Sequence, residues 1–368
     1  MKKYVRYLLV LLMCGFLTEV KAQTTFQVDG INYYLDGSEA RVSDNQYYSG
    51  SKIIIPNSVL YDGKNYPVTS IADSAFYSNW SLIEVTIPNS VTTIGDYAFA
   101  SCSGLKTVTI PNSVTTIGDY VFASCSGLKT VTIPNAMTSI GRNAFYGCTG
   151  LTEVTIPNAV TSIGINAFYG CTGLTEVTIP NSVTTIGERA FYRCTGLQTV
   201  IWNARNAEYY NGLSYDSPFS NCDRLTDFVF GEEVEHIPAY LCRELTLLNT
   251  IVIPNSVTSI GTNAFSFCRG LTKVSIPNSV KTIGNWAFYR CTGLTEVTIG
   301  NSVTSIGNRA FYSCTSLTEV SIPNSVKTIE FRAFEGCTGL KTVTIGNSVT
   351  TIGESAFYSC TSLTEVSI

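Results

Sequence analysis

Apolar and polar positions along this chain follow a unit of 23 residues. An isoleucine, in most units followed by glycine, marks the same place each time; it recurs at Ile94, Ile117, Ile140, Ile163 and Ile186, then at Ile260, Ile283, Ile306 and Ile352. Self-similarity at a period of about 20–50 residues is typical of a solenoid, in which each unit buries its apolar side against its neighbours. The sequence therefore predicts a stack of similar turns.

Each unit contains one strand pattern. In "LTEVTI" (174–179), Val177 and Ile179 alternate with Thr178, which predicts a half-buried strand with the threonine outward. The Pro-Asn pair that follows ends the strand and turns the chain. Because neighbouring strands stack at ~4.8 Å, we expect a parallel sheet along one face.

Each unit also contains the segment I-G-x-x-A-F-x-x-C. In "IGERAFYRC" (186–194), Ala190, Phe191 and Cys194 have the spacing of a short helical turn that faces the core. Strand and helical turn together predict an α/β repeat.

The complete unit, I-G-x-x-A-F-x-x-C-x-x-L-x-x-V-x-I-P-N-S-V-T-x, resembles the leucine-rich repeat, and its form is similar to the BspA-like (Treponema pallidum-type) bacterial subfamily. The resemblance extends from about Ile71 to Ile368. It implies a curved leucine-rich-repeat solenoid with a parallel β-sheet on one face and, for several members, display at the cell surface and attachment to host proteins. A right-handed β-helix is the alternative architecture, which the recurring A-F-x-x-C segment disfavours.

The two ends of the chain depart from the repeat. Residues 23–70 contain Asp29-Gly30 and Asp62-Gly63, each a hairpin signal between strand patterns, and predict an N-terminal β-rich cap on a solenoid that spans 71–368. The sequence stops at Ile368 inside a strand pattern. We therefore expect either that the native protein continues or that a partner protects this strand, and we favour the first.

Residues 1–22 have the features of a secretory signal peptide. Basic residues precede an apolar run at 7–17, and small residues end at Ala22, which predicts cleavage before Gln23. Lipid attachment at Cys14 is an alternative that the preceding methionine disfavours. Later segments fall short of the ~18 apolar residues of a membrane helix. We expect a secreted or cell-surface protein with no membrane span.

Charge narrows the choice of partner. Only 14% of residues are charged, and removal of residues 1–22 takes four basic and one acidic residue from totals of 23 and 27, leaving a net charge of about −7. Nucleic acid and anionic lipid are therefore poor partners.

Thirteen cysteines would suggest a disulfide framework in a secreted chain. Apart from Cys14, however, all but Cys242 occupy one position of the unit: Cys102, Cys125, Cys148, Cys171, Cys194, Cys222, Cys268, Cys291, Cys314, Cys337 and Cys360. Parallel side chains in such a ladder seldom meet the disulfide dihedral angle, and the spacing does not gather four thiolates around a metal. We expect mostly free, buried thiols.

Few residues suggest catalysis. His236 is the only histidine, and the sequence pairs no serine or cysteine with it. Two pairs of glutamates, Glu153 with Glu176 and Glu296 with Glu319, should lie side by side at strand spacing; a solvated polar face is the expected role, and a cation site or acid pair the alternative. We predict no enzyme, no catalytic residue, no metal and no cofactor.

The repeat is interrupted near its middle. The outward strand position is threonine or serine in the other full units but becomes apolar in three successive ones, at Ile201, Val229 and Val252. Ile186 and Ile237 are 51 residues apart, two periods plus five, and the extra residues lie within 203–219, which carries Tyr209, Tyr210 and Tyr215. An insertion beside an apolar patch predicts a ligand-binding site; alternatively, the insertion merely covers the patch.

A row of tyrosines follows the conserved phenylalanine position of the unit and is a second candidate surface: Tyr146, Tyr169, Tyr192, Tyr289 and Tyr312. The alternative is that each ring packs on the turn beside it and exposes only its hydroxyl.

These patterns favour an adhesin-like recognition protein, a rigid scaffold of roughly 60 Å at strand spacing that binds an extracellular protein of a host or neighbouring cell. A structural spacer for another domain and a glycan-binding protein are alternatives. A polysaccharide-active enzyme on a β-helix is disfavoured because the catalytic set is missing.

Overall fold

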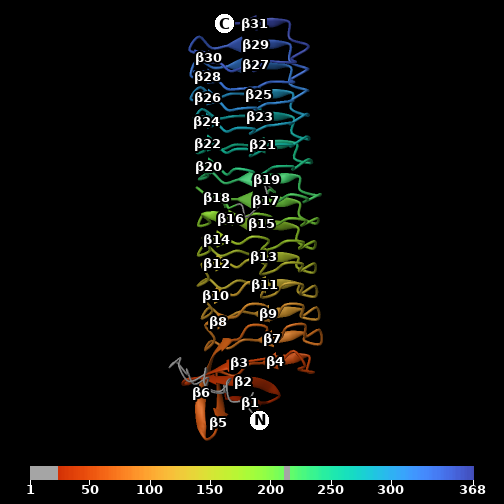
Figure 1. Cartoon of the computed structure of the whole chain (residues 1–368), viewed down its shortest axis with the longest axis vertical. Helices are drawn as coiled ribbons and strands as arrows, with labels where there is room; N and C mark the ends of the chain where they lie inside the picture. Colours follow the sequence, from red (N-terminus) through yellow and green to blue (C-terminus); the bar gives the residue numbers. More distant parts are fainter. Residues whose placement is uncertain (1–23, 211–215) are drawn as a thin grey trace, which may run out of the picture.

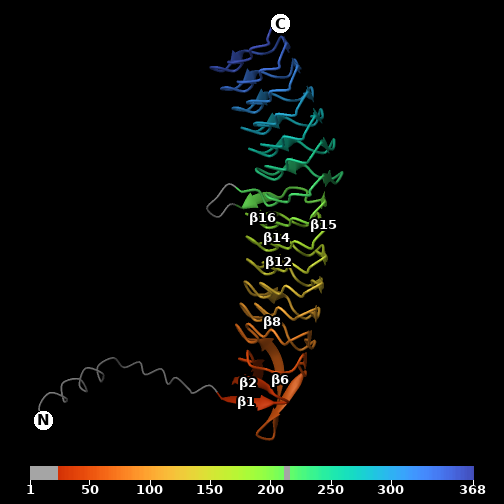
Figure 2. The ribbon, with the colours of Figure 1, turned by 90° about the vertical axis from the view of Figure 1, so that its right-hand side faces the viewer.

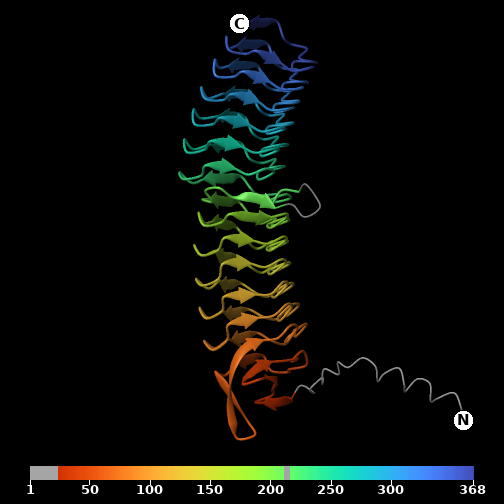
Figure 3. The same cartoon turned by 60° about the vertical axis from the view of Figure 1, so that its left-hand side comes forward.

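The computed structural model describes residues 24–210 and 216–368, which form an elongated stack of turns (Figure 1). Two rows of parallel strands run along the stack, and the stack is gently bowed (Figures 2 and 3). We call the strands of the predicted V-x-I pattern the major strands and the short strands that end near the repeat isoleucine the minor strands. The stack of 23-residue turns confirms the predicted solenoid.

The major strands are β7 (Glu84–Thr86), β9 (Thr107–Thr109), β11 (Thr130–Thr132), β13 (Glu153–Thr155), β15 (Glu176–Ile179), β17 (Thr199–Trp202), β19 (Asp227–Phe230), β21 (Thr250–Val252), β23 (Lys273–Ser275), β25 (Glu296–Thr298), β27 (Glu319–Ile322), β29 (Thr342–Ile345) and β31 (Glu365–Ser367). Equivalent residues of successive units pair with one another, so that Val131 pairs with Val108 on one side and with Val154 on the other. Inward valines are buried and outward threonines exposed, as the alternation predicts.

The minor strands were not predicted as a separate row. They are β8 (Thr93–Ile94), β10 (Thr116–Ile117), β12 (Ser139–Ile140), β14 (Ser162–Ile163), β16 (Thr185–Gly187), β18 (Glu208–Tyr210), β20 (His236–Ile237), β22 (Ser259–Ile260), β24 (Thr282–Ile283), β26 (Ser305–Ile306), β28 (Thr328–Ile329) and β30 (Thr351–Ile352). A two-residue strand is too short to show an alternating pattern in the sequence.

One end of the stack carries a partly antiparallel group of strands, of which β2 and β6 are longer than the major strands: β1 (Thr25–Val28), β2 (Ile31–Asp36), β3 (Glu39–Val42), β4 (Lys52–Ile54), β5 (Ser58–Tyr61) and β6 (Lys64–Ile71). Hairpins join β1 to β2 and β5 to β6 at the two Asp-Gly pairs. Strand β6 continues into the row of minor strands, and β4 pairs with β7. The expected signal peptide, 1–22, lies outside the described residues.

The prediction of helical turns, and with it the α/β class, is wrong: the described residues contain no helix. In the A-F-x-x-C segment alternate amides bond in different directions. Phe145 N donates to Ala167 O of the next turn at 2.8 Å, whereas Tyr146 N donates back to Asn143 O at 3.1 Å. Asn143 and Gly147 have φ of 53° and 68°, in the left-handed region. A helix needs negative φ and its own i−4 carbonyls throughout, so these segments, which we call the turn side, complete a β-solenoid.

The core consists of ladders of identical side chains. Phe168 stacks on Phe145 with ring centroids 5.2 Å apart and an interplanar angle of 7°. Cysteines lie beside this ladder as free thiols, buried except for the half-buried Cys360. Apart from Cys242, each thiol donates a hydrogen bond to a neighbouring turn; for example, Cys171 Sγ donates to Phe145 O at 3.2 Å. The buried thiol therefore has a partner without a disulfide.

Candidate functional site

The three apolar residues that replace threonine share one face of β17, β19 and β21. Ile201 pairs in register with Thr178 on one side and Val229 on the other, and Val252 lies on the next major strand. Val229 is 50% exposed and Val252 81%, whereas Ile201 is half-buried. The structure thus brings these residues together as an outward strip, which we call the valine strip.

The insertion lies elsewhere. Tyr209 sits in β18, where it pairs with Ile186 in the row of minor strands; Figure 1 shows β18 and β17 in different rows. The Tyr209 hydroxyl donates to the carbonyl of Asp216, and burial raises the pKa of Tyr209. The side chain of Tyr210, and Tyr215, lie outside the described part of the structure. The described residues of the insertion therefore do not cover the valine strip.

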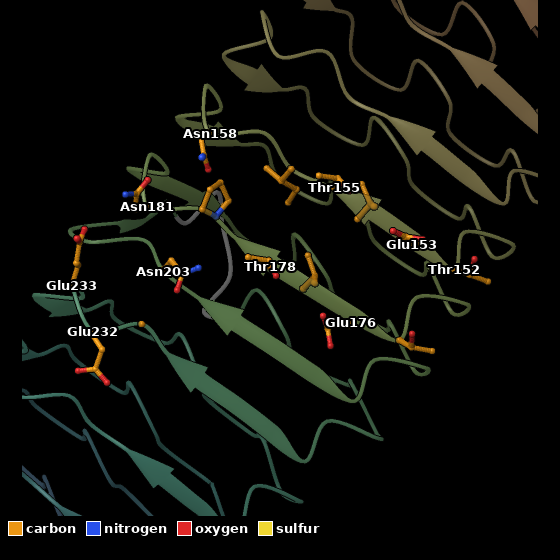
Figure 4. Close-up of a pocket in the computed structure, with 16 residues that line it drawn as sticks. Thr152, Glu153, Thr155, Asn158, Glu176, Thr178, Asn181, Asn203, Glu232 and Glu233 are labelled. Carbon is orange, nitrogen blue, oxygen red and sulfur yellow. The ribbon is translucent and has the colours of Figure 1, made fainter.

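A hollow of about 720 Å³ adjoins the strip. Thr178, the in-register neighbour of Ile201, lines it. Figure 4 shows Glu153 and Glu176 along β13 and β15, and Glu232 and Glu233 across the hollow from them. Its polar lining further includes the amides Asn158, Asn181 and Asn203. Among the described residues, no lysine or arginine lines this acidic hollow.

The two glutamate pairs differ in charge balance. Glu296 pairs in register with Glu319, and Lys273 Nζ lies 2.8 Å from Glu296 Oε2. No ion pair joins Glu153 or Glu176 to another described residue. Sequence reasoning found these pairs but missed Glu232 and Glu233, because they follow β19 in the irregular part of the repeat.

The tyrosine row stacks turn on turn. Tyr146 and Tyr169 have centroids 4.6 Å apart, and Tyr289 and Tyr312 5.0 Å. Tyr192 continues the first run, and the guanidinium carbons of Arg189 and Arg193 lie 5.5 and 5.6 Å from its ring centroid. The rings therefore pack on one another and leave one edge outward, since Tyr146 is 36% exposed.

His236 has a partner that the sequence did not indicate. Its Nδ1 lies 2.7 Å from Ser259 Oγ, because β20 and β22 pair these residues directly. Burial lowers the pKa of His236, and Glu208 opposes this effect. Within residues 24–210 and 216–368, no group of three metal-binding side chains occurs. No helix in the same part of the chain is long and apolar enough to cross a membrane.

Comparison with known proteins places these features in context. The model of the BspA type leucine rich repeat region (6 copies) matches residues 69–198, 138–272, 214–317 and 288–368. The structure of a leucine-rich repeat protein from Bacteroides ovatus ATCC 8483 is similar, with a TM-score of 0.67 and 31% identity over 93% of this chain and 94% of that chain. A leucine rich cell surface protein from Faecalibacterium prausnitzii A2-165 is 31% identical over 94% and 95% of the two chains, with a TM-score of 0.46. No curated protein matches the chain.

Proposed function

Because the chain belongs to the BspA-type leucine-rich repeat family and has its fold, we propose that it is a bacterial recognition protein, secreted or displayed at the cell surface, that binds an extracellular protein of a host or neighbouring cell. The signal-peptide pattern of residues 1–22 supports the location. The family match confirms the resemblance to BspA-like leucine-rich repeats that the repeat unit indicated. What we propose beyond the family is that the protein acts in adhesion and that its partner is an extracellular protein.

One observation carries it: the valine strip is exposed where other units carry threonine or serine. Val252 is 81% exposed and gains little from the fold, since its side chain faces solvent. Fully burying such a side chain against a partner is worth roughly 1.5–3 kcal/mol. An apolar strip on a rigid polar face is therefore suited to a binding surface.

The acidic hollow specifies the partner further. Its carboxylates lie beside the strip and lack basic neighbours in the lining. Complementary charge increases the association rate and selects between partners. We therefore propose a partner segment that presents an apolar side chain next to lysine or arginine.

The test is binding of residues 23–368 to an array of matrix and cell-surface glycoproteins. The variant I201T/V229T/V252T introduces threonine, as in the regular units, at all three positions of the strip. The control variant, Thr109→Val in β9, changes an outward residue of a major strand that is not part of the strip. We expect selective binding that weakens about tenfold or more in the triple variant and is unchanged in the control. Equal binding by all three proteins excludes the strip as the site. Absence of any binding favours a structural spacer.

A further inference from the structure

The turn side carries different side chains in different parts of the stack. Bulky residues occupy its positions of positive φ at a few places in the first half, such as Tyr97, Tyr120 and Arg193, and form a longer run in the second half. Each turn there has two positions with positive φ, which flank the tyrosine position. In the units from residue 140 to 173 they hold asparagine and glycine, residues suited to left-handed backbone. From residue 263 to 332 they include bulky side chains instead: Phe267 (φ 62°), Trp286 (53°), Arg290 (55°), Arg309 (51°) and Arg332 (57°). Bulky residues are uncommon at such φ values, so the backbone conformation does not account for their presence.

The same side chains form two stacks of alternating arginine and aromatic groups. In one, Phe267 lies between Arg243 and Arg290, with guanidinium carbons 5.7 and 6.0 Å from the ring centroid. In the other, Arg309 lies 6.0 Å from the ring of Trp286 and 5.0 Å from that of Phe331, and Arg332 lies 4.7 Å from the ring of Phe331. We call these two stacks the arginine–aromatic band.

Two guanidinium groups of the band keep their charge unpaired. Arg243 pairs with Glu244 at 3.0 Å and Arg332 with Glu335 at 3.1 Å. Arg290 and Arg309, by contrast, make no ion pair and no hydrogen bond from the side chain to any described residue; their contacts are with rings. A guanidinium stacked on a ring still has its N–H donors at the edge, where they can bond an oxyanion in bidentate fashion.

Aromatic rings beside these guanidinium groups provide partly exposed apolar surface. Arg290 lies 5.4 Å from the ring of Tyr289, which stacks on Tyr312 at 5.0 Å. Trp286, Tyr289 and Tyr312 are half-buried, so part of each ring faces solvent. Aromatic surfaces of this kind pack against the apolar faces of sugar rings as well as against protein.

We propose that the arginine–aromatic band binds an anionic polysaccharide, one that carries carboxylate or sulfate groups. Arg290 and Arg309 bind the acidic groups, and the exposed ring edges contact the sugars. Turns repeat at ~4.8 Å, so the band presents its groups in a line, as a linear polymer of repeating sugars does. The net charge of about −7 for residues 23–368 and the glutamates that pair with Arg243 and Arg332 disfavour nucleic acid, which needs a continuous basic surface. This site is separate from the valine strip and does not depend on it.

The experiment measures binding of residues 23–368 to heparin and to polygalacturonate, with dextran as the neutral glycan and poly-glutamate as the acidic peptide. The variant R290Q/R309Q is compared with R142Q/R224Q, which removes two exposed, unpaired arginines outside the band. We expect binding to an acidic glycan that falls at least tenfold in R290Q/R309Q, changes less than twofold in the control, and weakens with salt. Equal loss in both variants, no binding to either acidic glycan, or equally tight binding of poly-glutamate overturns the proposal.

A second variant separates binding from folding. Phe267→Gly and Trp286→Asn introduce the residues that the units from 140 to 173 hold at these two positions, Gly147 and Asn143 in the first of them. We therefore expect the double variant to be at least as thermally stable as the original chain. We also expect it to bind the acidic glycan at least fivefold more weakly. If it binds the glycan as well as the original chain, the rings are not part of a site. The variant I201T/V229T/V252T should retain glycan binding, which keeps this test independent of the protein partner.

Discussion

At the scale of single residues, the cysteine ladder shows how burial and hydrogen bonding suppress chemistry. Burial raises the pKa of Cys148 to about 12, and its thiol donates to Phe122 O at 3.1 Å. At pH 8 such a thiol is almost never a thiolate, which is the reactive form. The buried cysteines of the described residues therefore behave as small apolar side chains.

We predict that alkylating reagents do not label the buried cysteines of the ladder in the folded protein at pH 8. Cys360 is half-buried and its pKa rises only to about 11, so it should react first. All twelve cysteines of residues 23–368 should react after unfolding in guanidinium. Mass spectrometry counts the labels. Fewer labels on the unfolded, unreduced protein would reveal disulfides and contradict the ladder of free thiols.

A second residue-scale prediction concerns His236. Because burial lowers its pKa, the unfolded chain binds more protons than the folded one as the pH falls below about 6.5, the ordinary histidine value. Stability is therefore full above that pH and decreases as the pH drops through it. The chain has one histidine, so the variant His236→Thr, the residue of Thr185 in the same row, isolates the effect.

We expect the melting temperature of the original chain to fall more between pH 7.5 and pH 5.5 than that of His236→Thr. Thermal unfolding followed by circular dichroism gives both values. Identical pH dependence in the two proteins would mean that the folded state does not disfavour the charged imidazole.

At the scale of elements, the major strands could be predicted and the turn side could not. Alternation such as Val177–Thr178–Ile179 predicts a half-buried strand from local geometry alone, because successive side chains of a strand point to opposite faces. The spacing of Ala190, Phe191 and Cys194 is compatible with a helix, but it equally allows alternate amides to bond the next turn. That choice depends on a neighbour 23 residues away. The same contrast holds for the candidate site. The regular strand register predicts that the residues of the valine strip are neighbours, whereas the position of Tyr209 depends on the path of an irregular segment.

Backbone conformation gives a direct test of turn against helix. Asn166 has φ of 55°, where glycine is free of strain and alanine is not. We predict that Asn166→Gly is more stable than Asn166→Ala by about 1 kcal/mol. A helix interior would reverse the order, since alanine is favoured there by about 1 kcal/mol. Comparing the two variants with each other cancels the loss of the asparagine side chain, and urea unfolding measures the difference.

At the scale of the whole molecule, each turn contacts only its neighbours, which allows two different surfaces on one scaffold. The valine strip lies on β17, β19 and β21, and the arginine–aromatic band on the turn side of residues 243–332. A change in one unit alters neither the register nor the core of a distant one. Side chains can therefore depart from the repeat locally without a cost to the whole.

The same architecture determines how far the destabilisation caused by a substitution extends along the stack. Phe168 is fully buried between Phe145 and Phe191, at 5.2 and 4.9 Å, and Phe168→Ala should cost ~3–5 kcal/mol where it lies. In a stack with nearest-neighbour coupling, this loss reduces hydrogen-exchange protection in residues 140–200 and leaves 283–340 protected. Phe311→Ala, in the equivalent position of a distant unit, should give the reciprocal result. Hydrogen-exchange mass spectrometry on both variants distinguishes the two cases. If either substitution lowers protection along the entire chain, the solenoid unfolds as a single cooperative unit, and the independence of its two surfaces would not follow from the fold.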